Sequence, residues 1–158
     1  MHRAARIIMR PMDAKTSVGG KKREFALAVK GLRKILKPYD QKLRITKDTA
    51  SAYMSESKSV TYLGKPLMFA AIKSKSYVSF HLFPVYMFPD LVEGISPELK
   101  KRMQGKTCWN FKKAEESLFT ELGKVVDASF RRFAELGKRD LTREDAQALW
   151  GTAQNKKT

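Results

Sequence analysis

The sequence predicts an α+β fold: one twisted antiparallel sheet of about five strands with helices packed on one face. Amphipathic helical patterns lie near both ends of the 158-residue chain. Between them lie short runs of apolar or alternating residues, which are typical of strands. Short turns separate most of these runs, and such turns join antiparallel strands, whereas parallel neighbours need long crossovers. A chain of this length normally forms one domain.

The first predicted helix covers residues 24–37. Apolar residues recur there at helical spacing, lysines occupy the opposite side, and Pro38 ends the pattern. The segment before it contains Asp13 as its only acidic residue. We therefore expect a basic, flexible arm over residues 1–23, a single domain over residues 24–150 and a frayed tail over residues 151–158.

Five segments of the middle region fit strands. Leu43 and Ile45 alternate with polar or charged residues, which indicates a strand with one buried face. A continuous apolar run follows a Gly-Lys-Pro turn and has the length of a buried strand. The predicted strands lie around residues 43–47, 58–63, 67–72, 77–83 and 106–111.

The other segments are predicted from prolines and capping residues. Residues 84–89 are apolar but lie between two prolines, so we expect an ordered loop there. Ser96 followed by Pro97 is a typical helix start. The later helices are predicted over residues 97–104, 115–136 and, after a Thr142 cap, up to about residue 150.

Basic residues are concentrated in the first third of the chain. The protein has 32 Lys and Arg against 16 Asp and Glu, a net charge of +16. Residues 1–47 hold 14 basic and 3 acidic residues (net +11), residues 48–100 hold 5 of each, and residues 101–158 hold 13 and 8 (net +5). This excess favours polyanions as partners, and a solvated lysine-rich surface has the same composition.

The composition excludes several kinds of site. No apolar run reaches the roughly 18 residues of a membrane-spanning helix. One cysteine excludes an internal disulfide framework and a multi-cysteine metal site, and two histidines exclude a histidine-rich one. No metal motif or phosphate-binding loop occurs. We predict no metal, no cofactor and no membrane association.

A ligand site is predicted around residues 84–89 and the strand over residues 106–111. In this interpretation, a partly apolar pocket at the sheet edge takes an anionic small molecule or a protein partner. Lys65 and Lys106 attract the anion, Tyr86 and Trp109 supply apolar contact, and His81 forms a hydrogen bond. This hypothesis describes a binding domain that is not an enzyme.

The alternative hypothesis is sequence-independent association with nucleic acid. Six basic residues of the arm and first helix would contact phosphates: Lys21, Lys22, Arg23, Lys30, Arg33 and Lys34. Such contacts release counterions, so the binding would depend strongly on salt. The aromatic residues between positions 62 and 111 are a second candidate surface, because bases stack on exposed rings; the alternative is that these rings form the core.

Cys108 and His81 are the candidates for covalent chemistry in the domain. Strand alternation puts Ser79 and His81 on one face of their strand, and Cys108 and Asn110 on one face of another. A Cys108–His81 pair oriented by Asn110 requires the two strands to be neighbours, which the sequence does not show. The alternative is a buried cysteine and a hydrogen-bonded structural histidine.

The stretch from Gly64 to Phe133 carries an ordered set of motifs. A GKP turn precedes an apolar strand, the next strand ends in a proline, and a helix leads into a KTCWNF strand and a long helix. This arrangement resembles the YdhG-like domains, a largely uncharacterised bacterial family, and the resemblance implies a small cytoplasmic α+β domain. Some members are described as frataxin-like iron chaperones. That role needs an acidic surface, so the resemblance is carried over for the fold and for no iron-binding residue.

Overall fold

The computed structural model describes the backbone of residues 2–151 and the side chains of residues 19–149. The helices are α1 (His2–Leu36), α2 (Pro84–Met87), α3 (Pro97–Lys101), α4 (Glu116–Leu136) and α5 (Arg143–Ala146), with short helical turns at Lys37–Tyr39, Pro89–Val92 and Gln147–Gly151. The strands are β1 (Leu43–Asp48), β2 (Ala52–Tyr62), β3 (Lys65–Ser74), β4 (Val78–Leu82), β5 (Cys108–Phe111) and β6 (Asp140–Leu141). The predicted α+β class is confirmed.

The sheet runs in the order β1-β2-β3-β4-β5, and consecutive strands pair antiparallel. Short turns predict this for β1 to β4, whereas the connection from β4 to β5 contains α2 and α3. The sequence pattern missed β6, whose two residues pair parallel with Thr61 and Tyr62 of β2. A strand of two residues shows no alternation, so it leaves no signal in the sequence. The pairing of β1 with β2 shifts between Ile45 and Lys47, which marks a β-bulge.

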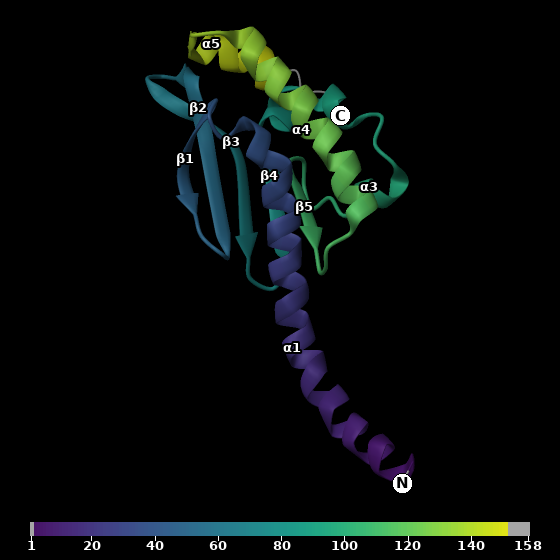
Figure 1. Ribbon diagram of the computed structural model, residues 1–158. Helices are drawn as coiled ribbons and strands as arrows, with labels where there is room; N and C mark the ends of the chain where they lie inside the picture. Colours follow the sequence, from purple (N-terminus) through teal and green to yellow (C-terminus); the bar gives the residue numbers. More distant parts are fainter. Residues whose placement is uncertain (1, 152–158) are drawn as a thin grey trace.

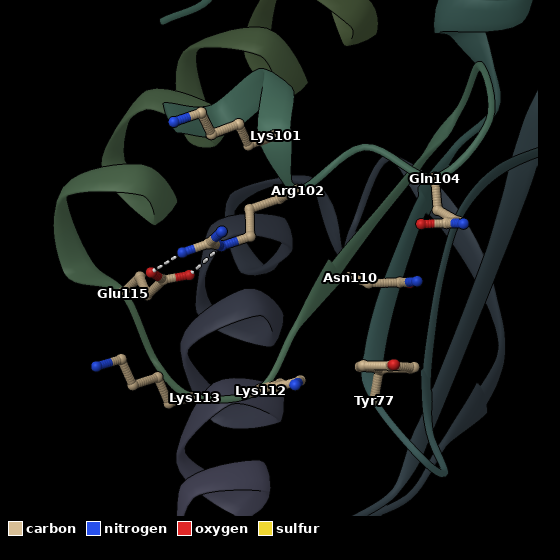
Figure 2. A pocket seen from close by; sticks show the side chains of 8 residues that line it. All are labelled: Tyr77, Lys101, Arg102, Gln104, Asn110, Lys112, Lys113 and Glu115. Atoms are coloured by element: carbon tan, nitrogen blue, oxygen red, sulfur yellow. Dashed lines mark hydrogen bonds and ion pairs between the residues drawn. The ribbon is translucent and has the colours of Figure 1, made fainter. Parts of the chain in front are cut away.

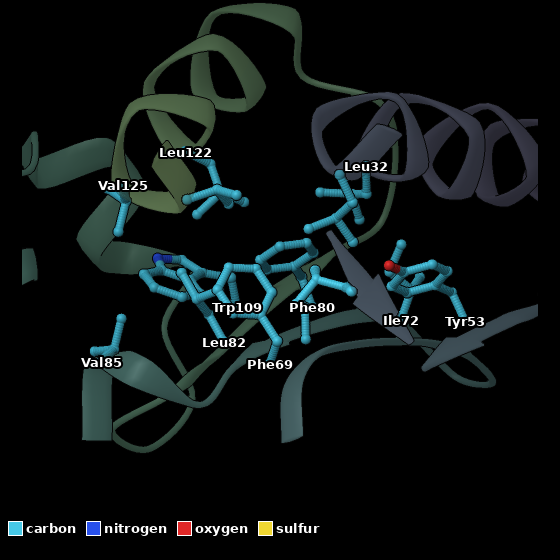
Figure 3. Close-up of a cluster of buried hydrophobic side chains, with 14 of the residues drawn as sticks. Leu32, Tyr53, Phe69, Ile72, Phe80, Leu82, Val85, Trp109, Leu122 and Val125 are labelled. Carbon is cyan, nitrogen blue, oxygen red and sulfur yellow. The ribbon is translucent and has the colours of Figure 1, made fainter. Parts of the chain in front are cut away.

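Helices α1 and α4 lie side by side over one face of the sheet (Figure 1). Helices α2 and α3 also contact α4, so the predicted helical layer on one face is confirmed. In Figure 3, Phe80 and Trp109 of the sheet lie below Leu32 of α1 and Leu122 of α4, and all four are fully buried. The buried stripe of α4 consists of Leu118, Phe119, Leu122, Val125, Val126, Ser129, Phe133 and Leu136.

Helix α1 begins at His2 rather than at Glu24, where the apolar pattern starts. Its first half projects away from the sheet (Figure 1), and a helix with no surface to cover needs no apolar stripe. The segment predicted as an arm is therefore helical from His2 onward. At the other end, the predicted stop holds: Leu36 is the last residue, and Pro38 lies in the short turn that follows. Residues 152–158 of the predicted tail lie outside the described residues.

The loop predicted over residues 84–89 is helical. Pro84 opens α2 and Pro89 opens the next helical turn. Proline is favoured at the first position of a helix, where its missing N–H has no partner to lose. The prediction treated both prolines as helix breakers, and here they start helical turns.

The predicted cap of α3 is confirmed and also ties this helix to α4. The Ser96 hydroxyl accepts a hydrogen bond from the Leu99 N–H at 3.2 Å. The N–H and hydroxyl of Ser96 both donate to the carboxylate of Glu121 on α4, each at 2.6 Å. Thr142 and Asp145 form the capping box predicted for α5.

Gly31 sets the distance between α1 and α4. A Cβ atom at this position would lie 2.8 Å from two carbons of the Phe119 ring. That ring is buried and makes an edge-on contact with Phe111 of β5, with centroids 4.9 Å apart. Gly123 on α4 has more room, since the nearest atom to a Cβ there is Ile35 Cγ2 at 3.7 Å. The two helices can approach this closely because residue 31 has no side chain.

We expect Gly31→Ala to lower the free energy of unfolding by about 1–3 kcal/mol, because the Phe119 ring has to move in a packed core. Gly123→Ala is the matched control and should be neutral or stabilising by up to about 1 kcal/mol, since alanine favours helix. Urea denaturation followed by circular dichroism measures both. Equal effects of the two substitutions would show that the close approach at Gly31 does not matter.

Candidate anion-binding site

A cavity of about 630 Å³ lies where α3, β5 and the start of α4 meet (Figure 2). Its volume is in the range of sites that hold small ligands. The walls come from four places in the chain, just before β4, after α3, on β5, and between β5 and α4. The lining residues are Tyr77, Lys101, Arg102, Gln104, Asn110, Lys112, Lys113 and Glu115.

The wall after α3 is held by main-chain hydrogen bonds to β5. The Asn110 N–H donates to the Arg102 carbonyl at 2.7 Å, and the Gln104 N–H donates to the Cys108 carbonyl at 2.8 Å. Gly105 then turns the chain with a φ of +82°, which glycine adopts without strain. The segment thus lies along β5 as a short extra strand, so this wall of the cavity is an extension of the sheet.

Arg102 and Glu115 form a bidentate ion pair in the cavity wall. Two guanidinium nitrogens of Arg102 donate to the two carboxylate oxygens at 2.7 and 2.6 Å. Hydrogen bonding to Arg102 lowers the pKa of Glu115, outweighing partial burial, and the same pairing raises the pKa of Arg102. Both groups are charged at neutral pH, and each already has its partner. The pair joins the end of α3 to the start of α4.

Lys101, Lys112 and Lys113 give the cavity its unbalanced charge. All three are exposed, and none forms an ion pair with any residue the structure describes. Together with the Arg102–Glu115 pair, the lining carries four basic groups against one acidic group, a net of +3. A cavity with this charge attracts an anion over a range set by the ionic strength.

Two lysine clusters flanking one predicted strand were the signal that sequence reasoning missed. Lys100-Lys101 ends α3, and Lys112-Lys113 follows β5. The chain after α3 runs antiparallel to β5, with Met103 paired to Trp109. This antiparallel segment brings the two lysine pairs to the same cavity. The sequence does not indicate the pairing, because the paired segment is too short to show an alternating pattern.

The structure brings Cys108 and His81 together on neighbouring strands. They are opposite each other in the register of β4 and β5, and Cys108 Sγ lies 3.6 Å from His81 Nε2. Asn110 joins the group, because its Oδ1 accepts from the Cys108 thiol at 3.5 Å and from the Ser79 hydroxyl at 2.8 Å. The adjacency that a catalytic pair requires is therefore present.

Burial sets the protonation of this pair. Cys108 is 9% exposed, and burial raises the pKa of its thiol more than a hydrogen bond with Ser79 lowers it. Burial also lowers the pKa of His81, and the positive charge of Lys73 lowers it further. At neutral pH the pair is a thiol beside a neutral imidazole. The thiolate that makes a cysteine strongly nucleophilic is disfavoured.

Only part of the predicted ligand site comes together. Lys106 Nζ lies 5.4 Å from the centroid of the Tyr86 ring, so these two are neighbours. Trp109 is fully buried in the core. Side chains alternate along β5, so Cys108 and Asn110 share the face away from the helices, and the Trp109 indole points toward the helices (Figure 3). The indole is not available to a ligand on the surface. Lys65 is exposed at the start of β3 and does not line the cavity.

Five of the six predicted phosphate contacts are exposed on α1: Lys21, Lys22, Arg23, Lys30 and Lys34. Arg33 is different, because its guanidinium donates to Asp40 at 3.0 and 2.9 Å and to Asp48 at 3.2 and 3.1 Å. It also lies 4.4 Å from the centroid of the Tyr53 ring. Burial lowers the pKa of Arg33, and the two carboxylates raise it by more. Arg33 therefore ties α1 to β1 and β2, and its hydrogen bonds to the two carboxylates use four of its five N–H groups, so it is poorly suited to contact a phosphate.

Comparisons with family models, curated proteins and solved structures found no match to this chain. The helices that the structure describes contain no apolar stretch of the length that a bilayer requires. Within the same residues, no three His, Cys, Asp or Glu side chains gather where they would hold a metal ion. The cavity and the surface charges are therefore the features of this protein that bear on its function.

We expect Cys108 to react slowly with iodoacetamide in the folded protein at neutral pH, because its thiol is protonated and nearly buried. The rate should rise with pH, and its midpoint should lie above that of the chain unfolded in urea, since burial raises the pKa. Cys108 is the only cysteine, so intact-mass spectrometry follows it without ambiguity. A folded protein that reacts as fast as the unfolded one would reveal an activated thiol and favour a catalytic Cys108–His81 pair.

Proposed function

We propose that this protein is a non-enzymatic domain that binds an anionic small molecule in the cavity between α3, β5 and the start of α4. The observation that carries the proposal is that one cavity is lined by three exposed lysines without ion-pair partners among the described residues. Arg102 is already neutralised by Glu115, so the lysines supply the charge for a ligand. We propose this site in place of the one predicted from the sequence, and for the same class of ligand. The residues of the predicted site were Lys65, His81, Tyr86, Lys106 and Trp109.

The Cys108–His81 pair gives no support to a catalytic role. Its sulfur is buried, and both groups are neutral at neutral pH. In this proposal Asn110 contributes to the cavity wall, and its hydrogen bonds with Ser79 and Cys108 hold its side chain in place.

We expect inorganic pyrophosphate to bind the cavity. Lys101→Gln/Lys113→Gln should weaken this binding about tenfold, since an exposed ion pair contributes up to about 1 kcal/mol and about 1.4 kcal/mol corresponds to a factor of ten. Isothermal titration calorimetry at low and high salt measures the affinity, which should fall with salt. Lys65→Gln/Lys138→Gln is the control, because it removes two exposed lysines outside the cavity. Equal losses in both variants would mean that net charge alone attracts the anion.

The resemblance to YdhG-like domains stays a proposal, as does the cytoplasmic location it implies. A protein partner in place of a small anion is the alternative occupant of the site. Iron delivery, the third role considered, gains no support from the cavity, because its one carboxylate, Glu115, is bound to Arg102.

A second candidate function is association with nucleic acid through α1. The supporting observation is that α1 extends beyond the sheet (Figure 1). Its second half, which packs on the sheet with one face, carries five exposed basic side chains between residues 21 and 34. The whole helix holds ten Lys and Arg against two Asp and Glu. A projecting cationic helix contacts phosphates with little regard to sequence.

We expect duplex DNA binding through α1 to weaken in Lys21→Gln/Lys22→Gln/Arg23→Gln. The slope of log K against log salt should become shallower by about 0.9 for each phosphate that the variant no longer neutralises. Fluorescence anisotropy across a salt series measures this slope. Lys65→Gln/Lys75→Gln/Lys138→Gln removes the same charge from elsewhere on the surface, and an equal change in that variant would exclude α1 as the specific DNA-binding surface.

A further inference from the structure

Tyr77 places an aromatic ring at the cavity. Its side chain is 44% exposed, one of only three large apolar side chains so exposed among the described residues. It immediately precedes β4 on the strand face that carries Ser79 and His81, away from the core. In Figure 2, the Tyr77 ring lies beside Asn110, on the wall opposite the Arg102–Glu115 pair. An exposed ring in a cavity wall offers a flat apolar surface to a ligand.

The ring is next to the positive charge of the same cavity. Lys112 Nζ lies over one face of the Tyr77 ring, 5.7 Å from its centroid, so a stacked base would take the other face of the ring or displace this side chain. Lys101 and Lys113 line the cavity with it. A ligand that uses both features needs a planar aromatic part and an anionic part within one small molecule.

Two amide side chains add hydrogen-bonding groups to this surface. The Oδ1 of Asn110 is occupied by Ser79 and Cys108, which leaves the amide N–H groups of Asn110 as donors. The Gln104 side chain is exposed at the cavity and has no hydrogen bond within the described part of the chain. Amide groups beside an aromatic ring suit the polar edge of a heterocyclic base.

We infer that the anion bound by this cavity is a nucleotide, with its base stacked on Tyr77 and its phosphate held by Lys101, Lys112 and Lys113. The inference rests on the proposed anion-binding function and names its ligand class. A simple oxyanion would contact the lysines and would make no contact with the Tyr77 ring or with the side-chain amides of Asn110 and Gln104. A nucleotide uses all three features, and the cavity of about 630 Å³ accommodates one.

The test compares adenosine 5′-monophosphate with ribose 5-phosphate on the full chain by isothermal titration calorimetry. Both probes carry the same phosphate, so the ratio of their dissociation constants isolates the base. We expect the nucleotide to bind at least about fivefold more tightly, as base–aromatic stacking provides. Tyr77→Ala should abolish the preference for the nucleotide, so that the ratio falls to about one, and should leave the affinity for ribose 5-phosphate unchanged. Tyr77→Phe keeps an aromatic ring and should keep the preference. Leu63→Ala is the matched control, because it removes a similarly exposed apolar side chain elsewhere.

Side-chain amide signals in nitrogen–proton correlation spectra give a second measurement. Those of Asn110 and Gln104 should shift with adenosine 5′-monophosphate more than with pyrophosphate. The nucleotide could be a free mononucleotide or the 5′ end of a nucleic-acid strand, and a 5′-phosphorylated dinucleotide distinguishes the two. Tighter binding of the dinucleotide than of the mononucleotide identifies a strand end, and equal binding identifies a free nucleotide.

Equal affinities for the two phosphates, or a nucleotide preference that survives in Tyr77→Ala, would overturn the inference. If ribose 5-phosphate and pyrophosphate still bind through the lysines, anion binding stands and only the stacking of a base on Tyr77 is excluded. If pyrophosphate does not bind at all, the proposed function fails as well.

Discussion

The packing of α1 against α4 at Gly31 is the contact on which the rest of the domain depends. At this short distance both helices lie over the same face of the sheet and contact each other (Figure 1). Phe119 transmits the contact to Phe111 at the end of β5, which directly precedes Lys112 and Lys113. The turn that carries half of the cavity's charge is therefore held in place by a glycine in another helix. The core and the candidate site are parts of one packing arrangement.

The basic residues divide into two groups that composition alone does not separate. Arg33 and Arg102 are held by carboxylates and join elements of the fold, Arg33 between α1 and the sheet, and Arg102 between α3 and α4. Arginine suits this role because its planar guanidinium binds carboxylates in a bidentate way. The lysines of the cavity and of α1 have no ion-pair partner in the described part of the chain. The charge that is available to a ligand is therefore mainly lysine charge.

Much of the fold was predictable because periodicity and capping are local. The long stripe of α4, the hairpin order of β1 to β4 and the Ser96 cap all follow from neighbouring residues. The site was harder, because it depends on pairings between segments. Nothing local shows that the chain after α3 returns along β5, that Cys108 faces His81, or that Trp109 turns inward while Asn110 faces the cavity. The first half of α1 and the two-residue β6 were not predicted for a related reason: neither contains a periodic pattern of apolar residues.

The bulge in β1 bears on how this sheet avoids aggregation. An open strand edge is a template for pairing with another chain. At one edge, β1 is irregular between Ile45 and Lys47 and carries exposed Arg44 and Lys47, while β6 pairs with the part of β2 beyond it. At the other edge, the Met103 segment already occupies β5. Both edges are thus unsuited to pairing with a strand of another molecule.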